Sequence, residues 1–536
     1  MKAKSLILAG TIAIFANMIT ACSAQVASKP AVNYENPQQT EVISLQSGRL
    51  TGVYTQDKKV RVYAGIPYAA PPVGDLRWKT PQPVNHWNGV LAADHFGPIA
   101  MQGRLPLFVS NGIAKAMGMP EKESEEPMSE DCLYLNVWTP AKMQEGGCPV
   151  LVYIHGGSLR TGAGSDDYCN GEEAARNGVV MVTINYRLGA FGYLALPELS
   201  KESGTGSGNY GVLDQIAALQ WVQQNISAFG GDPNKVTIAG ESAGSQSVSA
   251  LCASPLAKGL FRAAIGESAT FAAPHLASDL FSQQKSEDVG LKFMKEYKAS
   301  TLKELRAMSA DELMKHELSE VSITIDGYAL PKSAYQTYLD GEQSDVPLLI
   351  GYNAKEGGLF TLGQDPNPQE LRQKVCETFG DSIGQQILKF YPAQDKKEAK
   401  DALMQIVGVY AIGWPTDRWA EVQSRTGKSD VYRYYYTYRQ ETDLGAQHGT
   451  EMEFAYYNPG SQSKWSDADY AFSRKMFTYW MNFVKYGNPN GDETDSGQPA
   501  WTNYRQSPDK IMELGSHIGM KVEPNQNMFD LFNTLK

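Results

Sequence analysis

The sequence has few cysteines, and they are widely scattered. Of the six in the chain, one lies near the start and the others are Cys132, Cys148, Cys169, Cys252 and Cys376. No two of them form a CxxC pair, which is the usual signature of a structural zinc site. The sequence therefore predicts no metal site, and none of its motifs indicates a metal or an organic cofactor.

Long basic runs are also absent. Lys and Arg number 48 against 59 Asp and Glu, which leaves a formal net charge of −11. Proteins that bind nucleic acid usually carry a basic patch, so we expect no nucleic-acid partner. The chain shows no internal repeat and no heptad pattern, and 42% of its 536 residues are hydrophobic. That content is enough to bury a large core.

Apolar runs long enough to span a membrane, about 18–20 residues, are missing after the N-terminal segment. The N-terminal segment itself is different. Lys2 and Lys4 precede an apolar stretch from Leu6 to Ile19, and small residues follow it. This pattern is typical of a secretory signal peptide, so we expect the chain to be exported.

The signal ends in Ile-Thr-Ala-Cys at residues 19–22, which resembles the bacterial lipobox. In a lipobox the cysteine is acylated and becomes the new N-terminus. We therefore expect a signal peptide over 1–21, a lipidated Cys22, a polar tether over 22–40 and one domain over 41–536, with the protein anchored at the bacterial cell envelope. The alternative is ordinary cleavage after Ala24, which would give a periplasmic or secreted protein.

Strands and helices alternate through the middle of the chain. Unbroken apolar runs at 149–157 and 179–187 are typical of strands buried on both faces. A helix is predicted over 211–231, and a short strand at 235–240 precedes a second helix. This alternation predicts an α/β fold with a large, mostly parallel sheet and crossover helices.

The pentapeptide G-E-S-A-G at 240–244 lies between that short strand and the second helix. In the motif G-x-S-x-G the serine occupies a tight strand-to-helix turn, and the glycines permit close backbone approach. A simple packing turn of small residues could have the same sequence. Because a strand precedes the motif and a helix follows it, we interpret Ser242 as a nucleophile.

A nucleophilic serine needs a base and an acid, in the chain order serine, acid, histidine. His448 is the favoured base because it lies in a glycine-flanked loop directly after a predicted strand. His275 lies soon after the nucleophile helix, His316 lies on a charged helix face, and His517 near the end lacks a strong preceding strand. For the acid, Glu356 follows a buried strand on a glycine-rich turn, with Asp326 as a competitor.

The oxyanion of such a reaction needs backbone N–H groups that are already in place. The stretch "YIHGGSLRTGAG" follows a predicted buried strand, and its glycines allow the backbone to approach a substrate. We expect the N–H groups of Gly156, Gly157 and Ala243 to form the oxyanion hole. His155 precedes the serine, so it is interpreted as structural.

These segments resemble the type-B carboxylesterases, the family of the cholinesterases and bacterial para-nitrobenzyl esterases. The resemblance covers about residues 40–520 and includes "GIPYAAPPVGDLRWKTPQP", "SEDCLYLNVWTP" and "GNYGVLDQIAALQWVQQNISAFGGDPNKVTIAGESAG". It implies the α/β-hydrolase fold, with helical insertions that form a substrate gorge. It also implies Ser242 as nucleophile, Glu356 as acid, His448 as base, and Gly156, Gly157 and Ala243 as oxyanion donors.

The chain departs from the family in three places. Ala100 stands where the family often has a cysteine that pairs with the one at Cys132. The segment between these two residues contains no tryptophan, which disfavours a specific acetylcholinesterase. "AIGESAT" at 264–270 replaces an ending that is usually Q-S-G.

Together these features predict an exported serine carboxylesterase that acts on a small-molecule ester and contacts the membrane only through its lipid anchor. A lipase, thioesterase or amidase of the same fold is the first alternative. A non-catalytic adhesion protein is the second, but such proteins typically lack the nucleophile or the base.

Overall fold

The computed structural model describes residues 29–104, 125–268, 282–439, 445–459, 465–492 and 497–535. The expected signal peptide, Cys22 and His275 lie outside these ranges.

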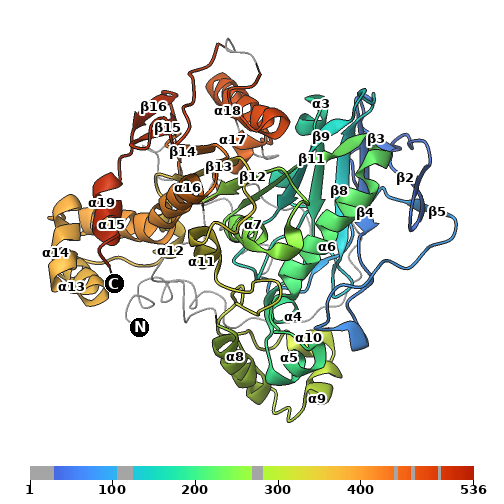
Figure 1. The fold of residues 1–536 in the computed structure, drawn as a ribbon, viewed down its shortest axis with the longest axis horizontal. Coiled ribbons are helices and arrows are strands. Elements are labelled where there is room, and N and C mark those ends of the chain that lie inside the picture. Colours follow the sequence, from blue (N-terminus) through green and yellow to red (C-terminus); the bar gives the residue numbers. More distant parts are fainter. Residues whose placement is uncertain are drawn as a thin grey trace.

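An eleven-stranded sheet forms the centre of the molecule (Figure 1), in the order β16-β15-β14-β13-β12-β11-β9-β10-β8-β4-β3. The strands are β3 (Val53–Tyr54), β4 (Val60–Pro67), β8 (Tyr134–Pro140), β9 (Cys148–Ile154), β10 (Val180–Ile184), β11 (Gly231–Glu241), β12 (Ala263–Glu267), β13 (Leu348–Asn353), β14 (Val431–Tyr436), β15 (Lys510–Leu514) and β16 (Gly519–Val522). The run from β10 to β15 is parallel, and antiparallel pairs flank it on both sides. The predicted α/β-hydrolase architecture is confirmed.

The central strands form because their side chains are apolar on both faces. In β9, Val150, Val152 and Ile154 pack into one hydrophobic core, whereas Leu151 and Tyr153 pack into another. Successive residues of a strand point to opposite faces, so a strand buried on both sides needs an unbroken apolar run.

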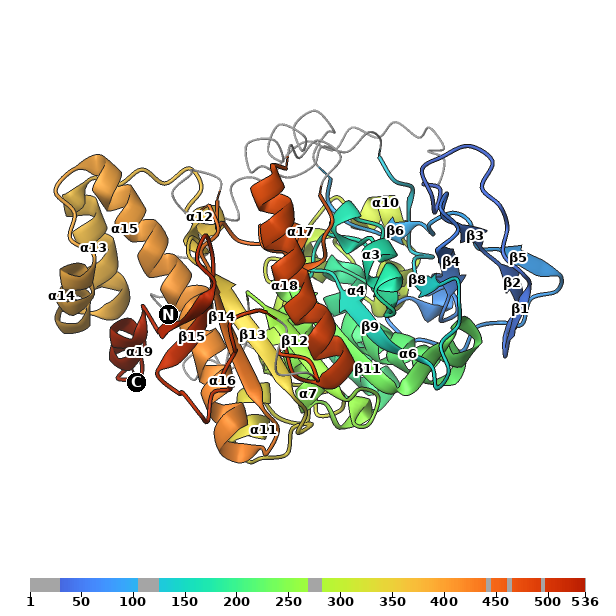
Figure 2. The same ribbon diagram turned by 90° about the horizontal axis from the view of Figure 1, so that it is seen from above.

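Helices cover both faces of the sheet (Figure 1 and Figure 2). Helices α6 and α7 pack on one face, and α3 and α18 pack on the other. The helices are α3 (Glu172–Arg176), α4 (Gly189–Tyr193), α5 (Pro197–Ser203), α6 (Tyr210–Asn225), α7 (Ala243–Ala253), α8 (Gln283–Glu296), α9 (Leu302–Arg306), α10 (Ala310–Leu313), α11 (Ala334–Leu339), α12 (Gly357–Phe360), α13 (Pro368–Phe379), α14 (Asp381–Phe390), α15 (Lys396–Gly408), α16 (Trp414–Thr426), α17 (Met452–Ala455), α18 (Asp467–Tyr486) and α19 (Gln526–Phe532).

The helix predicted over 211–231 is shorter than expected. Helix α6 ends at Asn225, a 3-10 turn continues to Phe229, and Gly230 then adopts a positive φ of 85°. The chain enters β11 at Gly231, so the second glycine of the Gly-Gly pair already belongs to a strand. A left-handed glycine is a common way to end a helix.

The tether predicted over 22–40 needs a correction from residue 29 onward. Ala31 and Val32 are each 6% exposed, and the N–H of Ala31 donates to the carbonyl of Asp94. Further along, the N–H of Thr40 donates to the carbonyl of Gly52. The prediction failed because polar composition alone does not show that two small apolar side chains can pack against the body.

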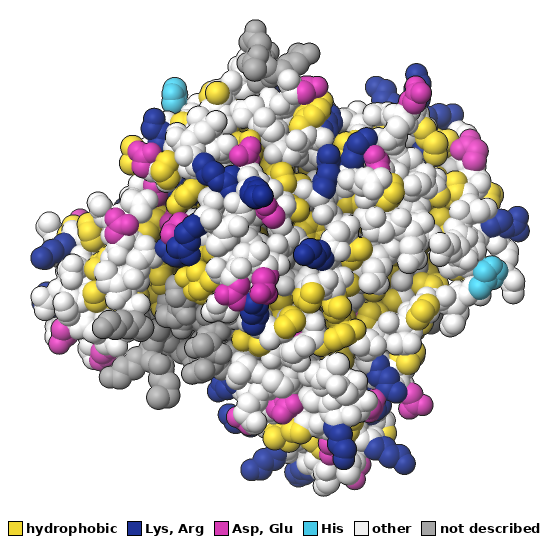
Figure 3. Space-filling view, viewed as in Figure 1, with side chains coloured by type: hydrophobic (Ala, Val, Ile, Leu, Met, Phe, Trp, Pro, Cys, Tyr) yellow, Lys and Arg dark blue, Asp and Glu magenta, His cyan; other side chains and the backbone are white. Residues whose placement is uncertain are grey.

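Two small sheets accompany the large one. Strands β1 (Ile43–Leu45), β2 (Gly48–Thr51) and β5 (Val90–Ala92) form the first, and β6 (Ile99–Ala100) pairs with β7 (Met128–Ser129) in the second. No helix within the described ranges has the length and apolar character that crossing a bilayer requires. Acidic and basic side chains are interspersed on the face seen in Figure 3.

Candidate active site

The carboxyl ends of four parallel strands carry the predicted site residues. Ser242 follows β11 directly, and Gly156 and Gly157 come just after β9. Glu356 lies three residues past the end of β13, and His448 lies in the loop after β14. Carboxyl ends of parallel strands meet at one edge of a sheet, where α/β proteins bind their ligands.

The turn at Ser242 is strained, and its flanking glycines make it sterically feasible. Ser242 has φ 56° and ψ −125°, a backbone conformation that non-glycine residues seldom adopt. A Cβ on Gly240 would lie 2.5 Å from the carbonyl carbon of Gly244, and one on Gly244 would collide with the carbonyl of Ile154. The turn therefore places Ser242 beyond the end of β11, and the backbone of the turn packs closely against the end of β9.

A continuous chain of hydrogen bonds runs from Ser242 to Glu356. The distance between Ser242 Oγ and His448 Nε2 is 2.9 Å, and that between His448 Nδ1 and Glu356 Oε2 is 2.6 Å. The other oxygen, Glu356 Oε1, accepts from the backbone N–H of Asn353 at 2.6 Å. Glu356 and His448 are only 2% and 8% exposed. The imidazole is thus held between a hydroxyl and a fixed carboxylate.

The glycine-rich loop after β9 passes directly against the serine. A Cβ on Gly156 would lie 3.1 Å from Ser242 Cβ and 2.7 Å from the carbonyl oxygen of Glu241. Gly157, Ser158 and Leu159 then adopt positive φ values of 94°, 57° and 59°. Glycine adopts such a φ without cost, but Ser158 and Leu159 are strained there, and the surrounding structure must hold them in place. Ala243, the third expected donor, is the first residue of α7.

The competing residues take other roles in the structure. His155 is buried and stacks on Tyr186 with ring centroids 4.4 Å apart. His316 and His517 are exposed at the surface. Asp326 Oδ1 accepts from the N–H groups of Tyr328 and Leu330, which closes a local turn.

Three further buried carboxylates lie in or next to the site, two of them close to the histidine, and sequence reasoning missed them. Glu241 Oε1 lies 3.3 Å from His448 Nε2, on the side of the ring that faces Ser242. Glu451 Oε1 accepts from the hydroxyl of Ser268 at 3.0 Å, and its Oε2 accepts from the side-chain amide of Asn353. Glu241 and Glu451 are 5% and 0% exposed. The signal in the sequence was their position, one residue before the serine and three after the histidine.

Glu267, the third of these carboxylates, belongs to the "AIGESAT" stretch. It ends β12 with 0% exposure. Its Oε2 accepts from the hydroxyl of Tyr456 at 2.8 Å, and its Oε1 accepts from the indole N–H of Trp480 at 3.0 Å. The departure from Q-S-G therefore places an additional ionisable group close to the site.

Burial and mutual repulsion shift the ionisation of these groups. Burial raises the pKa of Glu241 to about 8 and that of Glu451 to about 7, and it raises the pKa of Glu267 well above its ordinary value. Burial alone would lower the pKa of His448, but Glu241, Glu356 and Glu451 together raise it above 6.5. Interacting groups of this kind titrate as a set and share their protons.

The aromatic ring of Phe360 lies beside the histidine. The rings of Phe360 and His448 have centroids 5.5 Å apart. Leu359 and Leu362, on the same turn around α12, are 37% and 50% exposed. No group of three or more His, Cys, Asp or Glu side chains in the described part of the chain is arranged to hold a metal ion.

The five cysteines within the described residues are all free thiols. Cys132 is buried, and Ala100, which replaces its usual partner in the family, lies in the same hydrophobic core. Both residues line a small pocket that also contacts Trp78 and Phe191. The crosslink that the family often has is therefore missing here.

Comparison with known proteins identifies the family. The chain matches the model of the carboxylesterase family over residues 39–532. It is 34% identical over 502 residues to the fumonisin B1 esterase of Sphingopyxis macrogoltabida, an alignment that covers 88% of this chain and 86% of that protein. It is 32% identical over 508 residues to the para-nitrobenzyl esterase of Bacillus subtilis strain 168, with 90% and 96% covered.

A solved structure of PNB esterase superposes with a TM-score of 0.77 at 30% identity, covering 92% of this chain and 99% of that one. The chain belongs to the carboxylesterase family, and it is a carboxylic ester hydrolase with the α/β-hydrolase fold.

Proposed function

We propose that this protein is an exported serine carboxylesterase that cleaves esters through an acyl-enzyme on Ser242. The observation that carries the proposal is the unbroken hydrogen-bond chain from Ser242 through His448 to Glu356. A hydroxyl is a weak nucleophile by itself, and a neighbouring base that accepts its proton activates it.

In the proposed reaction, Ser242 Oγ attacks the ester carbonyl while His448 Nε2 takes the hydroxyl proton. The N–H groups of Gly156, Gly157 and Ala243 stabilise the oxyanion of the tetrahedral intermediate. When the intermediate collapses, His448 returns the proton to the alcohol, which leaves. Water then attacks the acyl-enzyme with His448 again as base, and the free acid is released with Ser242 restored.

Glu356 holds the imidazole in the tautomer that has its N–H on Nδ1, so that Nε2 is free to accept a proton. It also stabilises the positive charge that His448 gains in each step. A glutamate can replace an aspartate in this position because the acid orients the ring and need not take up the proton itself.

Replacing the nucleophile tests this mechanism. Ser242→Ala should lower kcat for a soluble para-nitrophenyl ester by about four to six orders of magnitude and leave the melting temperature nearly unchanged. His517→Gln is the matched control, because this histidine is exposed at the surface, and its activity should be normal. If Ser242→Ala keeps wild-type activity, the chemistry belongs to another residue.

Hydrolysis of para-nitrophenyl esters with graded acyl length would define the acyl preference and separate esterase from lipase activity. A thioester and an anilide of the preferred acyl group would test the thioesterase and amidase alternatives. The two relatives named above are called esterases of fumonisin B1 and of para-nitrobenzyl esters. We propose a para-nitrophenyl carboxylic ester as the first substrate to test.

We also propose that Cys22 is lipidated and holds the enzyme at the bacterial cell envelope. The basic, apolar and small-residue segments before Cys22 support this assignment. Two acyl chains suffice for stable anchoring, whereas one chain binds only marginally. The wild type should partition with membranes into detergent, and Cys22→Ser should not. A mature N-terminus that begins at unmodified Gln25 would instead establish ordinary secretion.

A further inference from the structure

The described chain begins beside the loop that carries the expected oxyanion glycines. The carbonyl of Lys29 accepts from the N–H of Phe96 at 2.8 Å. Its Nζ donates to the carbonyl of Ser165 at 3.1 Å and to Asp167 Oδ1 at 2.5 Å. Ser165 lies on the same loop as Gly157, eight residues further along the chain.

This loop is fixed to the carboxyl end of the sheet. The N–H of Gly164 donates to Asn185 Oδ1 at 2.8 Å, and Asn185 directly follows β10. The hydroxyl of Tyr186 donates to the carbonyl of His155 at 2.8 Å. Lys29 is therefore held at the same end of the sheet as Ser242.

The distance from Cys22 to this point is short. Seven peptide steps separate Cys22 from Lys29, which corresponds to at most about 25 Å of fully extended chain. With strands about 4.8 Å apart, an eleven-stranded sheet is about 50 Å wide. A lipid on Cys22 can therefore reach the catalytic end of the sheet near β4 and β10, so the surface that holds it lies at that end, but the lipid cannot reach the far edge at β16.

The catalytic end carries side chains suited to a lipid surface. We call Leu359, Leu362, Tyr438, Arg439 and Trp465 the catalytic rim. The two leucines are exposed, and Arg439 lies over the rings of Tyr438 and Phe454 at 5.7 and 5.9 Å. Trp465 stacks on Phe454 at 4.8 Å and is half-buried. Tyrosine, tryptophan and arginine above apolar side chains are typical of membrane interfaces.

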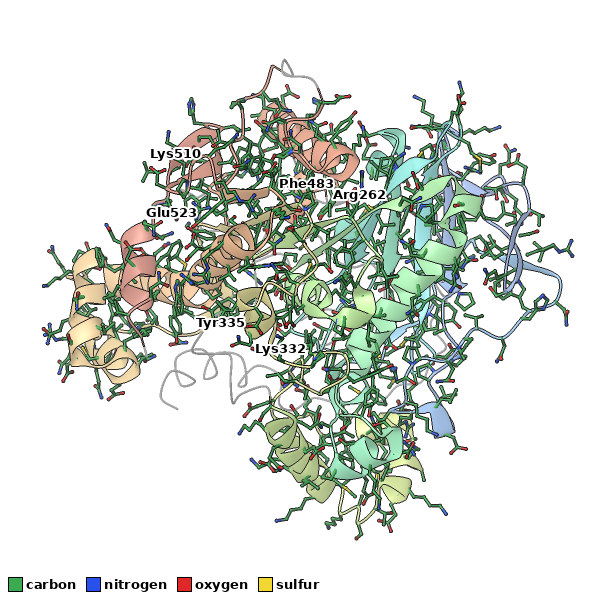
Figure 4. All side chains as sticks on the ribbon, in the orientation of Figure 1. Arg262, Lys332, Tyr335, Phe483, Lys510 and Glu523 are labelled. Carbon is green, nitrogen blue, oxygen red and sulfur yellow. The ribbon has the colours of Figure 1, made fainter. Side chains whose placement is uncertain are left out.

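The opposite end of the sheet provides a comparison. Val522, at 63% exposure, pairs with Lys510 at the start of β15, the end away from Ser242. Figure 4 labels Lys510 and the neighbouring Glu523 there. Lys521 Nζ lies 3.1 Å from Glu513 Oε1, so this apolar side chain stands among charged ones.

We propose that the catalytic rim faces the lipid surface to which Cys22 is anchored, and that the enzyme takes esters that partition into that surface. This inference rests on the proposed function, namely a serine esterase with a lipid on Cys22. It adds the orientation of the enzyme and the class of substrate, an amphiphilic or membrane-soluble ester.

The orientation is tested with an environment-sensitive NBD probe on a single added cysteine. Leu362→Cys and Val522→Cys are each made in the lipidated full chain with Cys376→Ser, because the other four described cysteines are buried. Vesicles of phosphatidylethanolamine and phosphatidylglycerol should raise the emission of the probe at 362 about twofold or more as it enters apolar surroundings. The probe at 522 should not respond.

The substrate class is tested by comparing two esters on the same vesicles. Leu362→Ser should raise KM for para-nitrophenyl laurate dissolved in the vesicles by about threefold or more, because the variant no longer buries an apolar side chain in the lipid. It should leave KM for soluble para-nitrophenyl acetate unchanged. Val522→Ser is the matched control and should change neither value.

The outcomes separate the two proposals. A response at 522 with none at 362, on anchored and active enzyme, would overturn the orientation and leave the esterase function intact. Equal effects of Leu362→Ser on both esters would overturn the substrate class. If the wild type does not hydrolyse para-nitrophenyl acetate, or if intact mass shows that Cys22 is unmodified, the proposed function is wrong. This inference then fails with it.

Discussion

Buried carboxylates occur in two parts of the molecule, and their partners differ. In the scaffold, Asp214 pairs with Arg187, whose Nη2 and Nε lie 2.7 and 2.8 Å from its two oxygens. Asp417 pairs with Arg433 through a single contact between Oδ1 and Nη1. In the site, Glu267, Glu356 and Glu451 accept from the imidazole of His448 and from hydroxyl, amide, indole and backbone groups, and Glu241 Oε1 lies 3.3 Å from His448 Nε2. Among the described residues, none of these four pairs with a lysine or arginine.

The difference in partners indicates what the buried carboxylates do in each part of the molecule. A permanent cation neutralises a buried carboxylate at all times, so the scaffold pairs serve the folded state. Around the site, Glu241 and Glu356 instead face His448, which becomes a cation when it takes the proton of Ser242. A carboxylate held beside the imidazole stabilises that cation, and so the transition state, more than it stabilises the resting enzyme with a neutral histidine.

The largest expected effect comes from the acid of the site. Glu356→Gln keeps the shape of the side chain but removes its charge and allows the wrong histidine tautomer. Activity should fall about 10⁴-fold, as expected when a triad acid becomes an amide. Steady-state kinetics with a soluble ester measures the loss. Urea denaturation should show little change in the free energy of unfolding. A large decrease would show that Glu356 stabilises the fold as the scaffold pairs do.

Asp214→Asn should produce the opposite result. It leaves the guanidinium of Arg187 buried without its partner, which typically costs about 3–5 kcal/mol of folding stability. The folded fraction should keep its kcat, because neither residue contacts the triad in the structure. The control is the double variant Arg187→Met with Asp214→Leu, which removes both charges and should recover much of the stability. A drop in kcat with unchanged stability would contradict this assignment.

Glu241→Gln tests whether the carboxylate of Glu241 raises the pKa of His448. His448 must be neutral to accept a proton, so the raised pKa of His448 places the acid limb of activity above pH 6.5. Glu241 is the largest of the causes that raise it, and its removal should move the limb of kcat/KM down by about one pH unit. If the acid limb of the kcat/KM profile stays where it is or moves to higher pH, Glu241 does not act as a charged group over the pH range in which the enzyme works.

Glu267→Gln should have the smallest effect, and it restores the residue usual in the family. Burial raises the pKa of Glu267 in the folded state, so the folded chain holds this proton more tightly than the unfolded chain does. The contribution of Glu267 to the free energy of unfolding is greatest below the pKa of the unfolded chain, about 4.5. This contribution is lost as pH rises through the higher pKa of the folded chain. Glutamine cannot ionise, so the variant should melt slightly higher than the wild type at pH 8.5 and equally at pH 4. A lower melting temperature at pH 8.5 would show that the carboxylate is stabilising.

The main parts of the fold and the triad positions could be predicted from the sequence because they depend on local patterns. Unbroken apolar runs mark strands buried on both faces, and G-x-S-x-G marks a turn that only glycines permit. Glu356 and His448 were found because each follows a buried strand, and the carboxyl ends of parallel strands meet at one edge.

The extra carboxylates could not be predicted in the same way. Glu241 and Glu451 lie next to residues that were singled out, but their burial depends on how four strand ends and a loop pack together. Glu267 shows this most clearly, because its two partners, Tyr456 and Trp480, lie about 190 and 213 residues away in the chain. Contacts of that separation leave no trace in local periodicity.

Labelling with an organophosphate tests the central claim most directly. Such reagents phosphorylate a serine only where a base has activated it. Peptide mapping by mass spectrometry should find one adduct, on the peptide that contains Ser242, with activity lost in proportion to labelling. Ser242→Ala should take up none. An adduct on a different serine, formed as activity disappears, would contradict the account.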